Sequence, residues 1–218
     1  QVTVGVFDCL TGKTIYLKAG DPTDRYFTNI AWSPDSKTVY MFEVNRDQND
    51  SRLTAYDAET GEKTGELYRE TDEKYVEPLH PIMFLPWDSN RFIMQSRKDG
   101  YNHLYPCTLG KQGSRMASNT ESLDIRQLTS GKWEVMEVLG FNRKRKSIII
   151  ASNECSPIQR NIFLVDTQTG KRTMMDDCGK GWHNATLSES GQFVYDNYST
   201  PTVPRQIAIV NTENGKRT

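Results

Sequence analysis

Residues 165–173 read VDTQTGKRT, a polar turn of the type Asp-x-x-x-Gly-Lys that follows an apolar run. Glycine permits the positive φ angle that a tight hairpin needs, and the aspartate side chain can accept hydrogen bonds from its own turn. The preceding run, NIFLVD at 161–166, is rich in β-branched and aromatic residues, which favour strands. This stretch therefore predicts two antiparallel strands joined at Gly170.

The same turn recurs along the chain. Its copies are FDCLTGKT (7–14), YDAETGEKT (56–64), CTLGKQ (107–112), VDTQTGKRT (165–173) and VNTENGKRT (210–218). They recur roughly every 45 to 60 residues, which is the spacing of four-stranded blades in a β-propeller. Only the stretch at 112–127 is irregular, and we expect a loop insertion or a short helix there.

A second hairpin precedes most of these turns. It is present in NIAWSPDSKTVYMFEV (29–44), PIMFLPWDSNRFIMQS (81–96), VLGFNRKRKSIIIAS (138–152) and ATLSESGQFVYDNY (185–198). Hairpin and turn together give four antiparallel strands per unit. We therefore predict an all-β chain that forms a partial β-propeller of about four to five four-stranded blades, with an incomplete ring.

The predicted blade bounds are about 1–20 (partial), 26–70, 79–129, 133–177 and 182–218 (partial), all within a single propeller segment at 1–218. Because the first and last blades are incomplete, we expect the chain to be a piece of a longer protein. Four large apolar residues occupy nearly corresponding places in successive blades, and we expect them in the core between stacked sheets. They are Trp32, Phe84, Phe141 and Leu187.

The charge balance argues against polyanionic partners. Lys and Arg (27) nearly equal Asp and Glu (28), so a net charge of -1 gives no broad field that would attract nucleic acid or an anionic membrane. The basic run NRKRK at 142–146 lies at a predicted hairpin tip and lacks interleaved aromatic residues for base stacking. No run of about 18 apolar residues is present. We expect no nucleic-acid partner.

The segment RKDGYNHLYPC at 97–107 concentrates side chains that are common in active sites, among them His103 and Cys107. In the blade register, however, residues 92–96 are a second strand, 97–102 a connecting hairpin and 103–109 a third strand. We therefore expect this segment to be held by packing.

The cysteines do not form a recognisable metal or disulfide pattern. The four cysteines are widely spaced, without a C-x-x-C pair. Cys178 is close in sequence to His183, and His103 to Cys107, but neither pair belongs to a set of four metal ligands. We expect no metal and no cofactor. Cys155 and Cys178 fall in one predicted blade and could form a disulfide if the protein is exported.

Four segments carry a resemblance to a known family. They are SRKDGYNHLY (96–105), IRQLTSGKWEVMEVLGF (125–141), SNECSPIQRNIFLVDTQTGKRT (152–173) and GWHNATLSESGQFVYDNYS (181–199). In this order they resemble successive blades of the N-terminal β-propeller of dipeptidyl peptidase IV-like serine peptidases of the prolyl oligopeptidase clan. The resemblance implies an eight-bladed propeller paired with a C-terminal α/β-hydrolase domain that removes N-terminal dipeptides with Pro or Ala second. It also implies that the propeller restricts access and grips the substrate's amine.

The catalytic chemistry itself is missing from the sequence. A hydrolase needs a strained G-x-S-x-G turn, and the chain contains none. We therefore expect no catalytic residues and no peptidase activity from these residues alone. The family's paired glutamates for the substrate amine are also absent, since no Glu-Glu pair occurs; the nearest substitute, Asp176 and Asp177, is interpreted as a solvated turn.

One family site can be carried over by position. Relatives line the substrate tunnel with an aromatic residue followed by Arg and Pro. When this motif is aligned without gaps with YVEPLHP (75–81), its three residues fall on Leu79, His80 and Pro81. The aromatic residue and the Arg are both replaced here. We expect Leu79 and His80 to line the substrate channel, with an ordinary loop histidine as the alternative for His80.

The leading hypothesis is a non-catalytic propeller segment of a dipeptidyl peptidase IV-like exopeptidase. It would gate and position peptide substrates for a missing hydrolase domain of the same chain. The resemblance implies a periplasmic, secreted or membrane-anchored location, and uncovered blade faces would permit self-association. An alternative is a stand-alone TolB-like propeller that binds a protein partner; a G-x-S-x-G turn after Thr218, with downstream Asp and His, would decide between them. A propeller glycosidase would need two paired carboxylates, and single residues such as Glu43, Glu134 and Glu154 cannot be paired from sequence.

Overall fold

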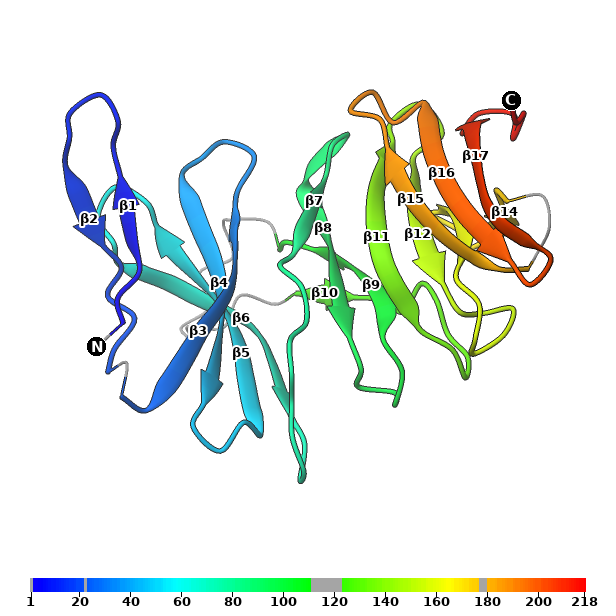
Figure 1. Ribbon diagram of the computed structural model, residues 1–218. Helices are drawn as coiled ribbons and strands as arrows, with labels where there is room; N and C mark the ends of the chain where they lie inside the picture. Colours follow the sequence, from blue (N-terminus) through cyan, green and yellow to red (C-terminus); the bar gives the residue numbers. More distant parts are fainter. Residues whose placement is uncertain (1, 22, 111–122, 177–179) are drawn as a thin grey trace. The chain divides into compact units, whose positions relative to one another are not determined.

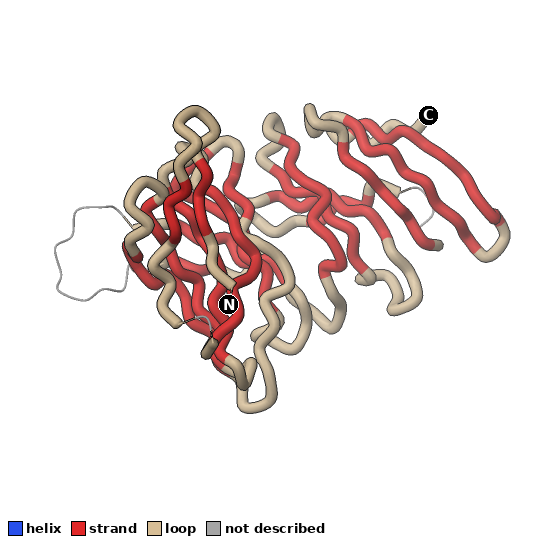
Figure 2. The backbone as a smooth tube through the Cα atoms, turned by 60° about the vertical axis from the view of Figure 1, so that its left-hand side comes forward, coloured by secondary structure: helices blue, strands red, loops and turns tan. Residues whose placement is uncertain are grey.

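The computed structural model describes residues 2–21, 23–110, 123–176 and 180–218. The regular elements in these ranges are all β-strands, numbered β1 to β17, and most of them are labelled in Figure 1. Figure 2 accordingly draws the described chain as strands joined by loops, with no helix. No helix in the described ranges could cross a membrane.

The strands form five antiparallel sheets, and each sheet is built from strands that are consecutive in sequence. Sheet 1 consists of β1 (Gly5–Phe7) and β2 (Thr14–Tyr16), and sheet 2 of β3 (Arg25–Trp32), β4 (Thr38–Asn45), β5 (Asp50–Asp57) and β6 (Lys63–Thr71). Sheet 3 consists of β7 (Met83–Leu85), β8 (Asp88–Ser96), β9 (His103–Thr108) and β10 (Asp124–Ile125). Sheet 4 consists of β11 (Val135–Asn142), β12 (Ser147–Ser152), β13 (Asn161–Asp166) and β14 (Arg172–Met174), and sheet 5 of β15 (Trp182–Leu187), β16 (Phe193–Thr200) and β17 (Val203–Asn211).

This architecture confirms the predicted fold class, an all-β partial propeller. Successive four-stranded meanders are the blades of that fold. The second and third strands of sheet 3 also confirm the strand–hairpin–strand assignment over 92–109. Most of the irregular stretch at 112–127 lies outside the described residues, so the loop or helix expected there is not described.

The turn chemistry behaves as the sequence indicates. In the turn between β13 and β14, the Asp166 carboxylate accepts hydrogen bonds from the amides of Gln168 (3.0 Å) and Thr169 (2.7 Å). Gly170 then adopts a φ of 72°. Gly supplies this left-handed conformation without the clash that a Cβ would cause. The same Asp-to-backbone pattern recurs at Asp57, which explains why these turns repeat as a unit.

The described chain divides into two compact units, Gln1–Gln95 with Pro106–Arg126 and Ser96–Tyr105 with Gln127–Thr218. Each unit has its own hydrophobic core. In the first unit the core side chains come from sheet 2 and from the residues after β2, and they are Leu17, Ala19, Val39, Met41, Tyr56 and Ala58. In the second unit they come from sheets 4 and 5 and are Ile149, Ile162, Leu164, Met175, Ala185, Val194 and Val210.

The expectation that Trp32 belongs to the core is wrong, because its side chain is 46% exposed. Trp32 ends β3, an edge strand of sheet 2, so its side chain is not enclosed by neighbouring strands. Phe84, Phe141 and Leu187 are half-buried. Phe84 packs between the rings of Tyr40 and Phe92, with centroid distances of 5.5 Å to each.

Candidate functional site

His103 is a packed core residue. Its side chain is fully buried at the start of β9, with Nδ1 3.1 Å from the Thr129 hydroxyl and Nε2 3.0 Å from the Gly131 carbonyl oxygen. A carbonyl only accepts, so Nε2 carries the proton and Nδ1 accepts from Thr129. The ring also contacts the edge of Trp133 at 4.8 Å. Because Cys107 is buried too, the expectation that this segment is held by packing is confirmed.

The interpretation of Asp176 as a solvated turn residue is wrong. Asp176 is buried, and its carboxylate accepts hydrogen bonds from the amide of Ile162 (2.9 Å) and from Nδ2 of Asn161 (3.3 Å). It therefore satisfies polar groups at the start of β13, an interior role that burial requires. Its neighbour Asp177 lies outside the described residues.

Cys155 is exposed on the surface. The pKa of this thiol is raised, first by partial burial and then by the charges of Asp176 and Glu154. Its expected partner Cys178 lies outside the described residues, so the disulfide stays a prediction. Within the described ranges, no group of three or more His, Cys, Asp or Glu side chains could hold a metal ion.

The predicted channel residues Leu79 and His80 lie in the connector between β6 and β7, and both are half-buried. This connector is hydrogen-bonded to sheet 2 at the β4–β5 turn and at the middle of β3. The Val76 amide donates to the carbonyl of Gln48 in the β4–β5 turn (2.7 Å), and the carbonyl of Pro78 accepts from Nδ2 of Asn29 in β3 (2.5 Å). The backbone before Leu79 is thus fixed to two places on sheet 2.

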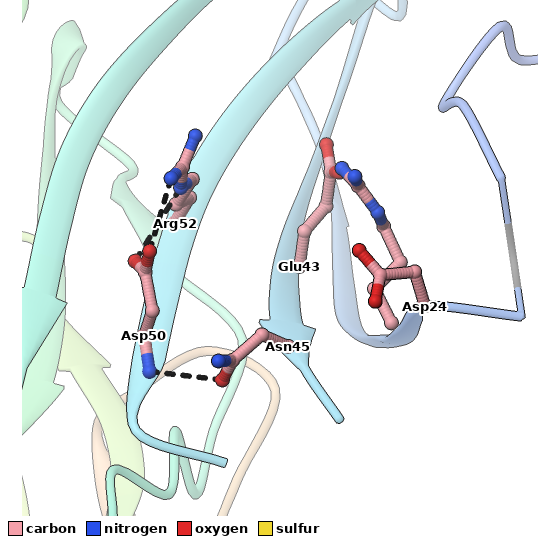
Figure 3. A pocket seen from close by; sticks show the side chains of 6 residues that line it. Asp24, Glu43, Asn45, Asp50 and Arg52 are labelled. Carbon is pink, nitrogen blue, oxygen red and sulfur yellow. Dashed lines mark hydrogen bonds and ion pairs between the residues drawn. The ribbon is translucent and has the colours of Figure 1, made fainter. Parts of the chain in front are cut away.

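A pocket of about 230 Å³ opens at the end of sheet 2 that carries the β4–β5 turn (Figure 3). It is formed where β3 begins, β4 ends and β5 begins, so the β4–β5 turn borders both the pocket and the connector. Its lining consists almost entirely of charged side chains: Asp24, Arg25, Glu43, Asn45, Asp50 and Arg52.

Glu43 is the buried carboxylate of this pocket, with only 4% of its side chain exposed. It accepts hydrogen bonds from the Tyr56 hydroxyl (2.5 Å) and from Nη1 of Arg25 (2.7 Å). Burial, and then the hydrogen bond to Glu43, raise the pKa of Tyr56, so its hydroxyl stays protonated and donates. The charge of Glu43 is therefore balanced by a guanidinium and fixed by a phenol.

Asp50 forms the opposite wall of the pocket. Its carboxylate accepts from Nη2 of Arg52 (2.9 Å) and from Nη2 of Arg69 (2.8 Å). The hydrogen bonds from Arg69 and then from Arg52 lower the pKa of Asp50 to about 2. The amide of Asp50 also donates to Oδ1 of Asn45 (3.0 Å), which closes the β4–β5 turn (Figure 3). Asp50 is therefore ionised at neutral pH, and the hydrogen bonds hold both carboxyl groups in place.

The arrangement is suited to binding and not to acyl transfer. Its lining offers three carboxylates and two guanidinium groups but no serine or cysteine nucleophile. Nε of Arg25 is buried without a hydrogen-bond partner, which leaves one donor of the pocket unused. The sequence offered one signal for this site, a glutamate within the apolar strand TVYMFEV at 38–44, where a buried charge needs partners.

Comparisons with known proteins place these observations in context. Residues 1–205 match the family model of the dipeptidyl peptidase IV (DPP IV) N-terminal region. A solved structure of a putative dipeptidyl aminopeptidase IV from Bacteroides ovatus is 46% identical, with a TM-score of 0.86 over 99% of this chain and 31% of that chain. Porphyromonas gingivalis dipeptidyl peptidase 4 shares the fold, at 20% identity and a TM-score of 0.79 over 99% of this chain and 28% of that chain.

A curated relative, the probable dipeptidyl-aminopeptidase B of Aspergillus oryzae, is 28% identical over 203 residues. The match covers 87% of this chain and 21% of the relative. The chain therefore spans about a fifth of the length of the curated relatives it matches.

Proposed function

The chain belongs to the family of dipeptidyl peptidase IV N-terminal regions, and from this membership we propose that it is the non-catalytic propeller segment of a serine exopeptidase that releases N-terminal dipeptides. Its role is to gate and position peptide substrates for an α/β-hydrolase domain of the same polypeptide. The observation that carries the proposal is the match of residues 1–205 to this family. The 46% identity to a putative dipeptidyl aminopeptidase IV gives further support.

Within this role, we assign the substrate-facing position to Leu79 and His80. The hydrogen bonds at Val76 and Pro78 support this assignment, because they hold the connector to sheet 2, the first at the β4–β5 turn beside the charged pocket and the second at the middle of β3. A fixed backbone presents a channel-lining side chain without the entropic cost of ordering it on binding. A peptide that passes this end of sheet 2 would meet one apolar and one polar side chain.

The test uses the longer polypeptide in which these residues precede a hydrolase domain. Leu79→Ala and His80→Ala should each raise KM for an Ala-Pro chromogenic substrate about threefold to tenfold with kcat retained, because they remove ground-state contacts. Lys74→Ala, at an exposed position of the same connector, serves as the matched control. An unchanged KM in both variants would show that Leu79 and His80 do not line the channel. A longer polypeptide without a domain that carries a G-x-S-x-G turn would contradict the proposed exopeptidase.

The family resemblance also supports an exported location, in the periplasm, outside the cell or anchored to a membrane. Alkylation of the free thiols in the protein purified from its natural compartment tests this proposal, because it shows which cysteines are disulfide-bonded. A disulfide between Cys155 and Cys178 would agree with an oxidising compartment, whereas recovery of the protein in the cytosol would contradict export. Self-association is measured separately, by light scattering over a range of concentrations.

A further inference from the structure

Asn29 lies at a β-bulge inside β3. Thr28 pairs with Phe42 of β4 and Ala31 pairs with Tyr40, so two residues of β3 stand opposite one residue of β4. At this irregularity Asn29 adopts a φ of 54°, in the left-handed region. Asparagine tolerates this conformation better than most residues do, but the conformation is still unfavourable for it. The bulge therefore stores backbone strain within β3.

The position of this strain is unusual in the described part of the chain. The other described residues with a positive φ, glycines apart, are Ser36, Gln48 and Lys146. Each of them lies in a turn between two consecutive strands, where a left-handed residue is ordinary. Asn29 alone among these four lies inside a strand. Bulges and strained residues inside regular elements are concentrated at functional sites, so this bulge needs an explanation of its own.

The side chain of Asn29 supplies that explanation. Its Nδ2 donates to the carbonyl of Pro78 in the β6–β7 connector (2.5 Å), 49 residues further along the chain. Side chains of a regular strand alternate between the two faces of its sheet, and the extra residue of a bulge changes the direction in which they point. The left-handed bulge and the hydrogen bond are therefore parts of one arrangement that ties β3 to the connector.

The bond acts on the peptide unit that leads into the predicted channel residues. The carbonyl of Pro78 and the amide of Leu79 belong to one planar peptide unit, so a bond to the carbonyl also orients the amide. Pro78 and Pro81 have a fixed φ, and His80, as the residue before Pro81, favours extended conformations. The segment from Pro78 to Pro81 therefore has few free backbone angles, and Asn29 holds its first peptide unit.

We propose that Asn29 is a positioning residue that holds Leu79 and His80 where a peptide substrate passes. This inference rests on the proposed function of Leu79 and His80, and it adds the residue that fixes them. Asn29 acts through the carbonyl of Pro78, so removal of its amide group frees the connector at this point.

The connector has a second attachment, which gives an internal reference. The Val76 amide donates to the carbonyl of Gln48 (2.7 Å), and the Val76 side chain is buried. This attachment does not involve Asn29. Loss of the Asn29 amide group should therefore loosen Leu79 and leave Val76 ordered.

The first test measures backbone order in the 218-residue chain by NMR relaxation. Asn29→Gly retains the left-handed conformation but removes the side-chain amide. The order parameter of the Leu79 amide should fall from about 0.85 to below about 0.6, and that of the Val76 amide should not change. Ser36→Gly is the matched control, because it also places glycine at a left-handed position, in the β3–β4 turn. An unchanged order parameter at Leu79 in Asn29→Gly would overturn the inference.

Asn29→Asp repeats this measurement with a side chain of the same shape. Aspartate also tolerates the left-handed φ, but its carboxylate has no N–H group to donate to the Pro78 carbonyl. It should loosen Leu79 in the same way, and it decides the question if Asn29→Gly does not fold. An Asn29→Asp variant with an ordered Leu79 amide would contradict the positioning role.

The second test uses the longer polypeptide with a hydrolase domain and an Ala-Pro chromogenic substrate. Asn29→Gly should raise KM about twofold to fivefold with kcat retained, because displaced Leu79 and His80 lose ground-state contacts. In a background that carries both Leu79→Ala and His80→Ala, the same substitution should have no further effect on KM. A merely structural role would not give this coupling. Ser36→Gly should leave KM unchanged.

The outcomes separate this inference from the proposed function. If Leu79→Ala and His80→Ala raise KM but Asn29→Gly does not, or raises it equally in the background that carries both, Asn29 is not the positioning residue. If neither Leu79→Ala nor His80→Ala changes KM, the proposed channel position fails and Asn29 loses its substrate role with it. The order parameter of Leu79 then still decides whether Asn29 fixes the connector.

Discussion

The described histidines show how the environment of a residue sets its chemistry. His103 and His183 are equally buried, yet His103 faces a hydroxyl that can donate and His183 faces two acceptors. One geometry suits a neutral ring and the other a charged ring. The sequence motif around His103, with its tyrosines and a cysteine, suggests chemistry more strongly than the surroundings of His183 do. The motif is therefore a poor guide to the hydrogen-bonding surroundings of each histidine.

At the same scale, Glu43 should matter for stability. Glu43→Gln keeps an acceptor for Tyr56 but leaves Arg25 without its counter-charge, and we expect a loss of about 2 kcal/mol in the free energy of unfolding. Urea denaturation at neutral pH measures this loss. Glu62→Gln is the control, because Glu62 pairs with Lys18 at the surface and both side chains are more than half exposed. A Glu43→Gln variant as stable as the control would show that the buried pair adds nothing.

Asp50 gives a prediction on the acid side. Its folded pKa is lowered to about 2, so its contribution to stability is present above its ordinary value near 3.8 and is lost as the pH falls through about 2. Asp50→Asn should cost about 1–2 kcal/mol at neutral pH, a figure reduced for the solvent exposure of Arg52 and Arg69. Unfolding of both proteins from neutral to acidic pH measures the difference.

The difference between wild type and Asp50→Asn should shrink toward pH 2. Asp47→Asn, at an exposed position of the same turn, is the matched control and should show no such trend. If the difference stayed constant down to this pH, the ion pairs with Arg52 and Arg69 would not be its source.

At the scale of elements, the repeated glycine turns are similar in conformation but differ in their surroundings. Gly170 and Gly215 both have a φ of 72°. A Cβ added at Gly170 would lie 2.6 Å from the carbonyl oxygen of Leu128, whereas a Cβ at Gly215 would meet nothing within 4 Å. The first turn is therefore packed against another segment and the second is open.

This contrast predicts unequal effects of the same substitution. Gly215→Ala should cost about 1–2 kcal/mol, the strain of a left-handed alanine. Gly170→Ala should cost about 1–3 kcal/mol more, because backbone must move to admit the new methyl group. Thermal unfolding of the two variants measures the difference. Equal losses would mean that the strain of the turn alone, and not its contact with Leu128, decides the cost.

The strands themselves were predicted well because their signal is local. β12, with the sequence SIIIAS, is buried along its whole length, and its β-branched residues favour strands. The position of Trp32 was not predictable in this way. Its burial depends on which strand lies at the edge of sheet 2, a property of the sheet and not of the local sequence.

At the scale of the whole molecule, we expect no peptidase activity from these 218 residues alone. The chain contains no G-x-S-x-G turn, so no strained serine is available for acyl transfer. We expect the purified 218-residue chain to release no chromophore from a Gly-Pro chromogenic substrate above a buffer blank. Hydrolysis that elutes together with the chain, and that persists when a serine-peptidase inhibitor is added to block contaminating peptidases, would contradict this expectation.

The sequence by itself determined the repeat, the strand–turn alternation and the family, because turn residues and strand composition act over a few neighbouring positions. Only the tertiary structure decided which charges meet. Glu43 meets Arg25 and Tyr56, and His183 meets Asp196 and Asp176, through pairings between different strands and sheets. Hydrogen bonds and ion pairs act over a few ångströms in space, and the sequence specifies those distances only once its sheets have stacked.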